Sequence, residues 1–171
     1  LQGTGGVSSF GLLFAAAAGA RPIITSSSDE KLARAVELGA VGTVNYRRNP
    51  EWHEGVLELT AGRGVKHVLE IGGRETLPRA MQALDFGAHV SLIGGLTGFN
   101  GQVSFFQLFN KNASVTGFQV GSRADFEAMN RFLSGHQIRP IVDRVFDFEE
   151  AVEAFDFFMN GDFMGKVVVR H

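Results

Sequence analysis

The sequence predicts an α/β protein built on a doubly wound parallel sheet, and three observations support this prediction. Short apolar runs, each long enough for one strand, alternate along most of the chain with stretches of helical periodicity. Glycine-rich turns follow several of the strand-like runs, beginning with Leu1–Ser8 (L-Q-G-T-G-G-V-S). Helical connections between such strands are usually right-handed crossovers, so we expect consecutive strands to be parallel.

The first of these units is present only in part. Leu1 and Gln2 have the character of the end of a strand, residues 3–6 form a turn, and a helix follows over residues 7–18. Strands usually have about 5 or 6 residues, so we expect the sequence to be a piece of a larger protein in which the first strand is truncated. The helix is apolar around nearly its whole circumference, which predicts burial on nearly all sides.

The alternation continues through the next five strands. They are expected at residues 22–27, 43–46, 66–71, 88–93 and 113–120. Helices are expected between and after them: one capped by Ser28, one starting at Asn49 and Pro50, one from Leu77 to Leu84 that Gly87 ends, a Phe-rich one at 104–109, and one through 126–133. With the strand that ends at Gln2, six strands are predicted in the order 3-2-1-4-5-6.

The pattern changes after about His136. A strand at 140–148, a helix at 149–161 and a strand at 166–170 follow, and Val152, Phe155 and Met159 are expected to face inward from that helix. We therefore predict two parts, the doubly wound domain at residues 1–136 and a C-terminal segment at 137–171 that belongs to a different layer.

The composition excludes several classes of function. Sixteen basic residues are balanced by eighteen acidic ones, for a net charge of −2, and no basic run predicts a nucleic-acid partner. No apolar stretch is long enough to predict a membrane span. The chain has no cysteine, which suits a cytoplasmic location. The sixteen phenylalanines predict a large apolar core.

The glycine-rich turn has the properties of a phosphate-binding corner. Gly3 permits a tight turn, Gly5 lacks the Cβ that would block a pyrophosphate, and the following helix directs its free N–H groups and positive dipole end at the anion. We expect Thr4, Gly6 and Val7 to complete this corner. The third glycine of the usual G-x-G-x-x-G pattern is replaced by Ser8, so the turn alone is a weak signal.

Several stretches in a fixed order make the signal stronger. They are G-T-G-G-V-S at 3–8, S-S-S-D-E-K-L at 26–32, E-L-G-A at 37–40, V-N-Y-R at 44–47, G-R-G-V at 62–65 and G-K-V-V-V at 165–169. Together they resemble the cofactor-binding half of the medium-chain dehydrogenase/reductase superfamily, which includes the zinc-type alcohol dehydrogenases and quinone oxidoreductases. The resemblance implies a Rossmann fold for residues 1–136 and, for 137–171, the return segment of a GroES-like catalytic domain.

The same resemblance implies an oxidoreductase that transfers hydride between a nicotinamide dinucleotide and an alcohol, a carbonyl or an activated alkene. The zinc ligands of zinc-dependent members lie in the N-terminal domain, which this sequence lacks. The five histidines are scattered without ligand spacing, so we predict no metal site and no catalytic residue in this chain, although the parent could hold zinc. We expect the isolated chain to be inactive.

The end of the second strand distinguishes the two nicotinamide cofactors. A carboxylate there would bind the adenine-ribose 2′-hydroxyl of NAD, and the position holds Ser26. Ser26, Ser27 and Lys31 could approach a 2′-phosphate, and Tyr46 resembles the tyrosine that NADPH-using quinone and enone reductases place there. We therefore predict NADP(H) in preference to NAD(H). The acidic residues at 29 and 30 argue against this choice, and serines before a helix are also ordinary caps.

The remaining part of the predicted site follows three strand ends. Ligands of open α/β sheets bind beyond the carboxyl ends of the strands. The residues expected to line the ribose and nicotinamide are Ile71, Gly72, Gly73, Gly94, Gly95, Gln119 and Val120. The glycines among them would also make the turns.

Two further functions and a partner remain open at this point. A methyltransferase also uses a glycine turn, but it normally has an acid where Ser26 stands; a non-catalytic nucleotide-binding or assembly module is the second alternative. Strand 113–120 would form the sheet edge and carries no Lys, Glu or Pro to discourage pairing. We predict a homodimer through this strand, the alternative being that another domain covers it.

Overall fold

The computed structural model describes all 171 residues. Its helices are α1 (Gly6–Ala17), α2 (Asp29–Glu37), α3 (Trp52–Leu59), α4 (Leu77–Gln82), α5 (Phe105–Lys111), α6 (Arg123–Gly135) and α7 (Ala151–Asn160), with a 3₁₀ turn η1 (Phe148–Glu150) before the last. Its strands are β1 (Ile23–Ser26), β2 (Gly42–Asn45), β3 (Val65–Glu70), β4 (Leu84–Leu92), β5 (Ser114–Gly117), β6 (Val142–Asp147) and β7 (Lys166–Arg170).

All strand pairs are parallel, as the alternation of strands and helices predicts. They form three groups, β1-β2, β3-β4-β5 and β6-β7. Leu1 and Gln2 extend the first group, because Gln2 forms a parallel bridge with Thr25 and the Leu1 carbonyl accepts a hydrogen bond from the Thr25 amide at 3.0 Å. The predicted α/β class is therefore present, but the continuous six-stranded order is interrupted between Gln2 and β3.

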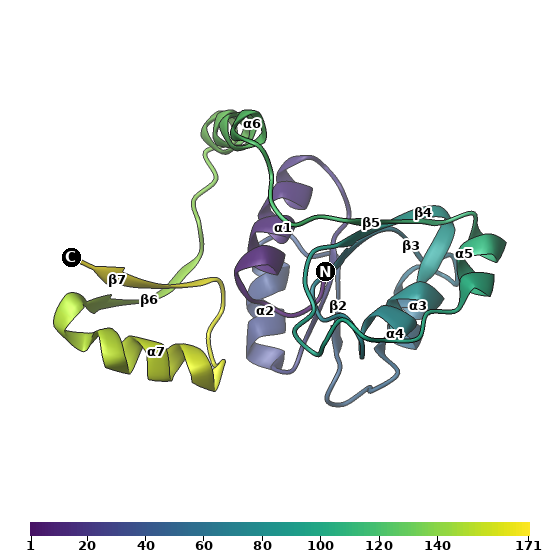
Figure 1. The fold of residues 1–171 in the computed structure, drawn as a ribbon, viewed down its shortest axis with the longest axis horizontal. Helices are drawn as coiled ribbons and strands as arrows, with labels where there is room; N and C mark the ends of the chain where they lie inside the picture. The colour runs from purple at the N-terminus through teal and green to yellow at the C-terminus, as the bar shows by residue number, and fades with distance from the viewer.

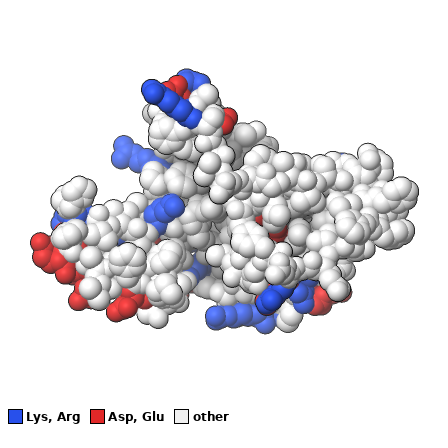
Figure 2. Space-filling model, in the orientation of Figure 1, with Lys and Arg blue, Asp and Glu red and all other residues white.

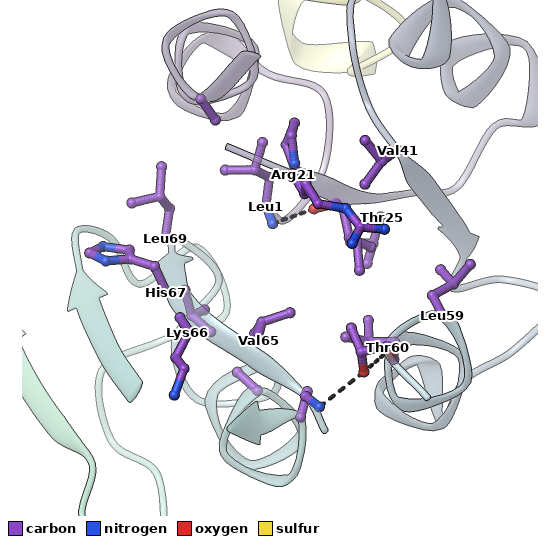
Figure 3. A pocket seen from close by; sticks show the side chains of 18 of the residues that line it. Leu1, Arg21, Thr25, Val41, Leu59, Thr60, Val65, Lys66, His67 and Leu69 are labelled. Carbon is purple, nitrogen blue, oxygen red and sulfur yellow. Dashed lines mark hydrogen bonds between the residues drawn. The ribbon is translucent and has the colours of Figure 1, made fainter. Parts of the chain in front are cut away.

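A cavity of about 670 Å³ occupies this interruption. It is lined by β1 on one side and by β3 on the other, with the side chain of Leu1 at one end, and the close-up shows Leu69, His67 and Val65 across from Leu1 and Thr25 (Figure 3). Its position is away from the carboxyl ends of the strands, where we expect ligands. The cavity is thus a gap in the sheet, only part of which Leu1 and Gln2 fill.

Helices cover both faces of the strands and create two apolar clusters (Figure 1). The larger lies under α3 and α4 and contains, among others, Trp52, Met81 and Val90. The smaller lies under α1 and α2 and is centred on Leu12 and Ile24. Burial on both faces is typical of parallel sheets.

Two helix boundaries differ from the sequence predictions. Asn49 and Pro50 lie in a turn, and α3 begins at Trp52 with Glu51 in the capping position. Leu84 belongs to β4, because α4 ends at Gln82 and Gly87, at φ 69°, lies inside the strand. The prediction that Ser28 caps a helix is confirmed, since its hydroxyl accepts a hydrogen bond from the Lys31 amide at 3.3 Å.

The predicted burial was wrong at several helices. Only Ser8, Ser9 and Leu12 of α1 are buried, and the apolar face of α7 is exposed at Val152, Phe155 and Met159. Ten of the sixteen phenylalanines are exposed: Phe86, Phe99, Phe105, Phe106, Phe109, Phe118, Phe126, Phe148, Phe155 and Phe158. The apolar residues therefore predict more core than this chain contains.

The C-terminal segment forms a group of its own beside α1 and α2 (Figure 1). β6 and β7 pair only with each other, and α7 packs against them. Ile141 and Met164 nevertheless belong to the apolar cluster of Leu12, so the segment is attached to the doubly wound part through side-chain packing. None of the seven α-helices combines the length and apolarity that crossing a lipid bilayer would need.

Candidate cofactor-binding edge

The glycine turn opens the predicted site. Gly3 has φ 68°, a conformation that disfavours residues with a side chain, while Gly5 has an extended conformation that any residue can adopt. A Cβ added to either glycine would meet no atom within 4 Å. The protein's own packing therefore gives no reason for glycine at position 5, whereas an approaching ligand would.

The start of α1 is fixed to this turn by two serines. The Ser8 hydroxyl donates to the Gln2 carbonyl at 2.5 Å, and the Ser9 hydroxyl donates to the Thr4 carbonyl at 3.0 Å. Ser8 stands where the usual third glycine would be, so its side chain has a structural use there. No acidic residue lies in the first turn of α1, and Gly5 supplies no side-chain cap. The positive end of the helix is thus available to an anion.

The C-terminal segment crosses the same turn. The Gly165 amide donates to the Thr4 carbonyl at 2.9 Å, and Gly165 forms a parallel bridge with Gly5. The Lys166 ammonium lies beside Gly6, because a Cβ on Gly6 would be 2.6 Å from its Nζ atom. Lys166 therefore brings a positive charge to the phosphate-binding corner, next to the N-terminus of α1.

The end of β1 carries the predicted ribose-binding serines. Ser26 is buried, its hydroxyl is 3.4 Å from the Ser28 amide, and its carbonyl accepts a hydrogen bond from the Tyr46 amide at 3.0 Å. Ser27 is half-buried and Tyr46 is exposed at the end of β2. The two strand ends are thus adjacent, with Tyr46 beside Ser26 as predicted. The Ser26 hydroxyl is less free to reach a phosphate than its sequence position suggests.

Lys31 is already engaged by the C-terminal segment. Its Nζ atom donates to the Gly161 carbonyl at 3.3 Å and lies 3.1 Å from Oδ1 of Asp162. Only 17% of the Lys31 side chain is exposed, against 88% for Asp162. The predicted phosphate-binding lysine therefore shares its site with a carboxylate that lies 131 positions further along the chain, which the sequence did not reveal.

The acidic residue Asp29 in the first turn of α2 is neutralised by neighbours. Its carboxylate accepts a hydrogen bond from the Asn45 amide nitrogen at 2.6 Å and forms an ion pair with Arg48. Asp29 argued against a phosphate at this end of the site. Because its charge is balanced by Arg48, this objection is weaker in the structure than in the sequence.

A buried carboxylate organises the other side of the site. Glu70 ends β3, is fully buried, and accepts hydrogen bonds from the amides of Gly72 and Gly73 at 2.9 Å and from the Thr76 hydroxyl at 2.5 Å. The Gln2 side chain donates to Glu70 at 2.6 Å and accepts from the Gly72 amide at 3.3 Å. We call Gln2, Glu70, Gly72, Gly73 and Thr76 the Glu70 cluster. It links the glycine turn to the end of β3.

The buried amino group of Leu1 lies within reach of this charge. Burial lowers the pKa of the amino group from 8.0 to about 6, and the nearby Glu70 carboxylate opposes this change. The amino group donates to the Ile23 carbonyl at 2.8 Å. The Glu70 carboxylate on β3 therefore acts electrostatically on the Leu1 amino group across the interruption in the sheet.

The loops after β3 and β4 pack directly on one another. A Cβ on Gly73, which has φ 87°, would come within 2.5 Å of the Gly98 carbonyl oxygen, and one on Gly94 within 2.8 Å of the Ile71 carbonyl oxygen. These glycines are required by close backbone contact, whatever else they bind. Ile71, Gly72, Gly73, Gly94 and Gly95 are together at the carboxyl end of the sheet, as predicted.

The end of β5 contributes least to a site. β5 ends at Gly117, three residues earlier than predicted, and Gln119 and Val120 lie beyond it and are exposed. The Phe118 amide still pairs with the Leu92 carbonyl at 2.9 Å, which keeps the segment beside the end of β4. Gln119 and Val120 are therefore near the predicted edge without being held by it.

Four residues of this edge were missed by the sequence reasoning. Glu70 and Gln2 could have been suspected, because a charged residue that ends an apolar strand just before two glycines needs a partner. Lys166 and Asp162 carried no such signal, since only the fold brings the last ten residues back onto the glycine turn and α2. His53 is also buried, with Nδ1 3.6 Å from Glu51.

The metal ligands of a zinc site are not assembled by this chain. No group of three or more His, Cys, Asp or Glu side chains is arranged to hold a metal ion, and the sequence has no cysteine. The nearest approach of two histidines is that of His67 and His89, whose ring centroids are 5.1 Å apart, and each is hydrogen-bonded to a serine. The residues present do not fit zinc.

The comparisons with known proteins agree with this arrangement. The family model for zinc-binding dehydrogenases matches residues 6–135. This chain belongs to the zinc-binding dehydrogenase family. A zinc-type alcohol dehydrogenase-like protein of Schizosaccharomyces pombe is 41% identical over 98% of this chain and 50% of its own length. The quinone oxidoreductase-like protein 2 of Bos taurus is 29% identical over 88% of this chain and 45% of its own length.

Solved structures show the same fold. A protein of Sinorhizobium meliloti 1021 that is provisionally named an alcohol dehydrogenase has a TM-score of 0.92 and 39% identity, over 99% of this chain and 49% of that one. An NAD-dependent alcohol dehydrogenase has a TM-score of 0.87 and 29% identity, with 99% and 50% covered. A crotonyl-CoA carboxylase/reductase in complex with NADP has a TM-score of 0.87 and 25% identity, with 98% and 48% covered. The chain thus spans about half the length of the relatives it matches.

Proposed function

We propose that this chain binds NADP(H), in preference to NAD(H), along the carboxyl edge of its parallel strands. It would be the cofactor-binding part of an oxidoreductase that acts on an alcohol, a carbonyl or an activated alkene. The observation that carries the proposal is the glycine turn, where the Cβ directions of Gly3 and Gly5 are open and the free N-terminus of α1 points at the same space.

The chain's own residues would divide the cofactor between them. Gly3, Gly5 and the first amides of α1, with Lys166 beside Gly6, suit a pyrophosphate. The turn held by Glu70 and the loop at Gly94 suit the ribose and nicotinamide, since both lie beyond the carboxyl ends of β3 and β4. The bound nicotinamide supplies the hydride chemistry, and the protein contributes position and polarity.

The preference for NADP(H) rests on the groups near the end of β1. A carboxylate that would bind the 2′-hydroxyl of NAD is replaced by Ser26, and Lys31 offers an ammonium close by. Arg48 neutralises Asp29, one of the two acidic residues that would oppose a phosphate there. The related structures do not decide the choice, because one is named as NAD-dependent and another holds NADP.

Titration of the protein with NADPH and NADH by calorimetry tests the proposal. Binding of NADPH should raise the midpoint of thermal unfolding, and NADH should bind more weakly. Adenosine 2′,5′-bisphosphate, which carries only the adenine side, should bind as well. The proposal would be wrong if none of the three bound; tighter binding of NADH than of NADPH would contradict the stated preference alone. A chain that binds no nucleotide would leave an assembly role as the better explanation.

We also propose that this chain binds cofactor without turning over substrate. The residues along its carboxyl edge include no group of metal ligands, and the chain spans about half the length of its relatives. Substrate contacts and any zinc would come from another part of the protein. Addition of NADPH with quinones or aldehydes should therefore give binding but no oxidation of the nicotinamide, as followed by the absorbance of the reduced ring. Steady turnover would contradict this.

We further propose that β5 forms a homodimer interface. β5 pairs only with β4, so its other edge is free, and its four residues are exposed. Phe105, Phe106 and Phe109 of α5 are exposed beside it, and Figure 2 shows this side of the molecule (right) nearly free of Lys, Arg, Asp and Glu. An unpaired strand edge with exposed phenylalanines nearby favours pairing with a second copy.

Sedimentation tests the dimer. The protein should be dimeric at about tens of micromolar, a range in which an interface of ordinary size is occupied. Val115→Lys should make it monomeric, because two ammonium groups would face each other across the new strand pair. Val152→Lys, at an exposed apolar residue of α7 away from this edge, is the matched control. A monomeric wild type, or a dimer that tolerates Val115→Lys, would exclude β5 as the interface.

A further inference from the structure

The turn between α7 and β7 places a carboxylate at the predicted 2′-phosphate site. Lys31 contacts both the Gly161 carbonyl, at 3.3 Å, and the Asp162 carboxylate, at 3.1 Å. Gly161 has φ 69°, which lets the chain reverse sharply enough to bring these two groups onto one ammonium. The first hydrogen bond fixes where the Lys31 ammonium lies, and the second partly neutralises it.

We propose that Asp162 is a specificity-determining residue, which weakens the binding of NADP(H) relative to NAD(H) by competing with the 2′-phosphate for Lys31. The proposal rests on the proposed function, because it assumes that the dinucleotide binds at this edge. A phosphate that approached the Lys31 ammonium would come within a few ångströms of the Asp162 carboxylate. Two anions at that separation repel one another, and the repulsion acts only on the cofactor that carries the extra phosphate.

Asp162 is able to leave this position when a phosphate arrives. Its side chain is 88% exposed and Lys31 is its only partner in an ion pair. Only the Asp162 end of the pair is in solvent, but water can replace Lys31 as the partner of that carboxylate, so moving it away costs little. The Gly161 carbonyl would meanwhile keep the Lys31 ammonium in place, because that hydrogen bond comes from the backbone. The Asp162 carboxylate therefore changes the charge at the site without determining the position of the Lys31 ammonium.

Asp162→Asn isolates the charge, because the amide has nearly the same size as the carboxylate. We expect this variant to bind NADPH about three- to tenfold more tightly, and NADH within about twofold of the wild type. The gain should shrink as salt is added, since the Debye length falls to about 8 Å at physiological ionic strength. Asp156→Asn, which removes an exposed carboxylate of α7 that has no ion-pair partner, is the matched control and should change neither affinity.

A double variant tests whether Asp162 acts through Lys31. In a Lys31→Ala background, Asp162→Asn should change the NADPH affinity by less than about twofold, because the two anions no longer share an ammonium. Calorimetry with NADPH, NADH and adenosine 2′,5′-bisphosphate measures all of these affinities without any substrate.

The outcomes separate the inference from the function on which it rests. If the wild type binds both cofactors and Asp162→Asn changes their ratio no more than Asp156→Asn does, the inference is overturned and the proposed function stands. An equal gain for NADPH and NADH would also overturn it, because the effect would not depend on the 2′-phosphate. If no variant binds any of the three nucleotides, the proposed function is wrong and the inference falls with it.

Discussion

The two sides of the candidate site are built in opposite ways. On the side of β3, the Glu70 cluster is buried and held by four hydrogen bonds to one carboxylate at 2.9 Å or less. On the side of β1, Lys31 forms an ion pair with Asp162, which is almost fully exposed, and Tyr46 lies beside Ser26 and is exposed. The structure of the first side depends on buried hydrogen bonds that stabilise the fold. The charges of the second side can be substituted without unfolding the chain.

This difference suggests a division of roles between the two sides. A nicotinamide and its ribose must be positioned closely, and a buried, fully hydrogen-bonded turn provides a rigid surface for that purpose. The choice between NADP(H) and NAD(H) depends on one phosphate, and exposed charges decide it at little cost in stability. Substitutions on the β3 side should therefore change stability, and those on the β1 side should change only affinity.

Loss of Glu70 is expected to have the largest effect. Glu70→Ala leaves the Gly73 amide and the Gln2 side-chain amide without an acceptor in a buried place, and leaves the Gly72 amide and the Thr76 hydroxyl with only longer contacts at 3.3 and 3.4 Å. We therefore expect the free energy of unfolding to fall by about 3 to 5 kcal/mol. Urea denaturation measures this. Glu37→Ala, at an exposed glutamate of α2, is the control and should stay within about 0.5 kcal/mol of the wild type. A similarly small change for Glu70→Ala would remove the distinction between the two sides.

Loss of Lys31 should affect affinity instead. Lys31→Ala removes a charge-assisted hydrogen bond to the 2′-phosphate, so we expect NADPH binding to weaken by about 1 to 3 kcal/mol while NADH binding stays nearly the same. The free energy of unfolding should change by less than about 1 kcal/mol, because the only ion pair lost is with exposed Asp162. Equal losses for both cofactors would show that Lys31 does not bind the 2′-phosphate.

Loss of Lys166 should weaken the binding of both cofactors to the same extent. Its ammonium lies beside Gly6 at the glycine turn, where both dinucleotides have their pyrophosphate. Lys166→Ala should therefore reduce the affinity for NADPH and for NADH by about 1 to 2 kcal/mol each, without changing their ratio. Calorimetry under the conditions used for Lys31→Ala makes the comparison direct. A change in the ratio would place Lys166 near the 2′-phosphate and away from the turn.

Much of this arrangement could be predicted from local sequence. Several strands were found because apolar runs end at glycines, and the turn at Gly3 was found because other stretches of the family pattern follow it in order. The boundary at Gly87 was wrong, because glycine is a common helix end and only pairing with β3 shows that the strand already runs through it. Burial was overestimated at Phe155 and Phe105, since an apolar helix face predicts a contact without stating whether this chain supplies the other surface.

Contacts between distant segments could not be predicted. Asp162 and Lys166 reach α2 and the glycine turn only because β7 returns past Thr4, and no periodicity near residue 162 indicates this. Glu70 was passed over because a single acidic residue at a strand end has many possible partners, and its actual partners are mostly backbone amides. The sequence therefore predicted which groups form the edge better than it predicted what holds them.

The smallest effect concerns pH and the strand that carries Glu70. Burial, with smaller contributions from His89 and the Leu1 amino group, lowers the pKa of His67 on β3 from its usual 6.5. Because the unfolded chain then binds a proton more readily than the folded one, stability from this group is complete above pH 6.5 and is lost as the pH falls below that value.

His67→Gln should therefore show a smaller loss of stability than the wild type when urea denaturation is compared at about pH 7.5 and pH 5.5. The Leu1 amino group, with its pKa of about 6, is present in both proteins, and its effect on His67 is part of the perturbation that this comparison measures. An identical pH dependence in the two proteins would show that His67 is not perturbed by its position on β3.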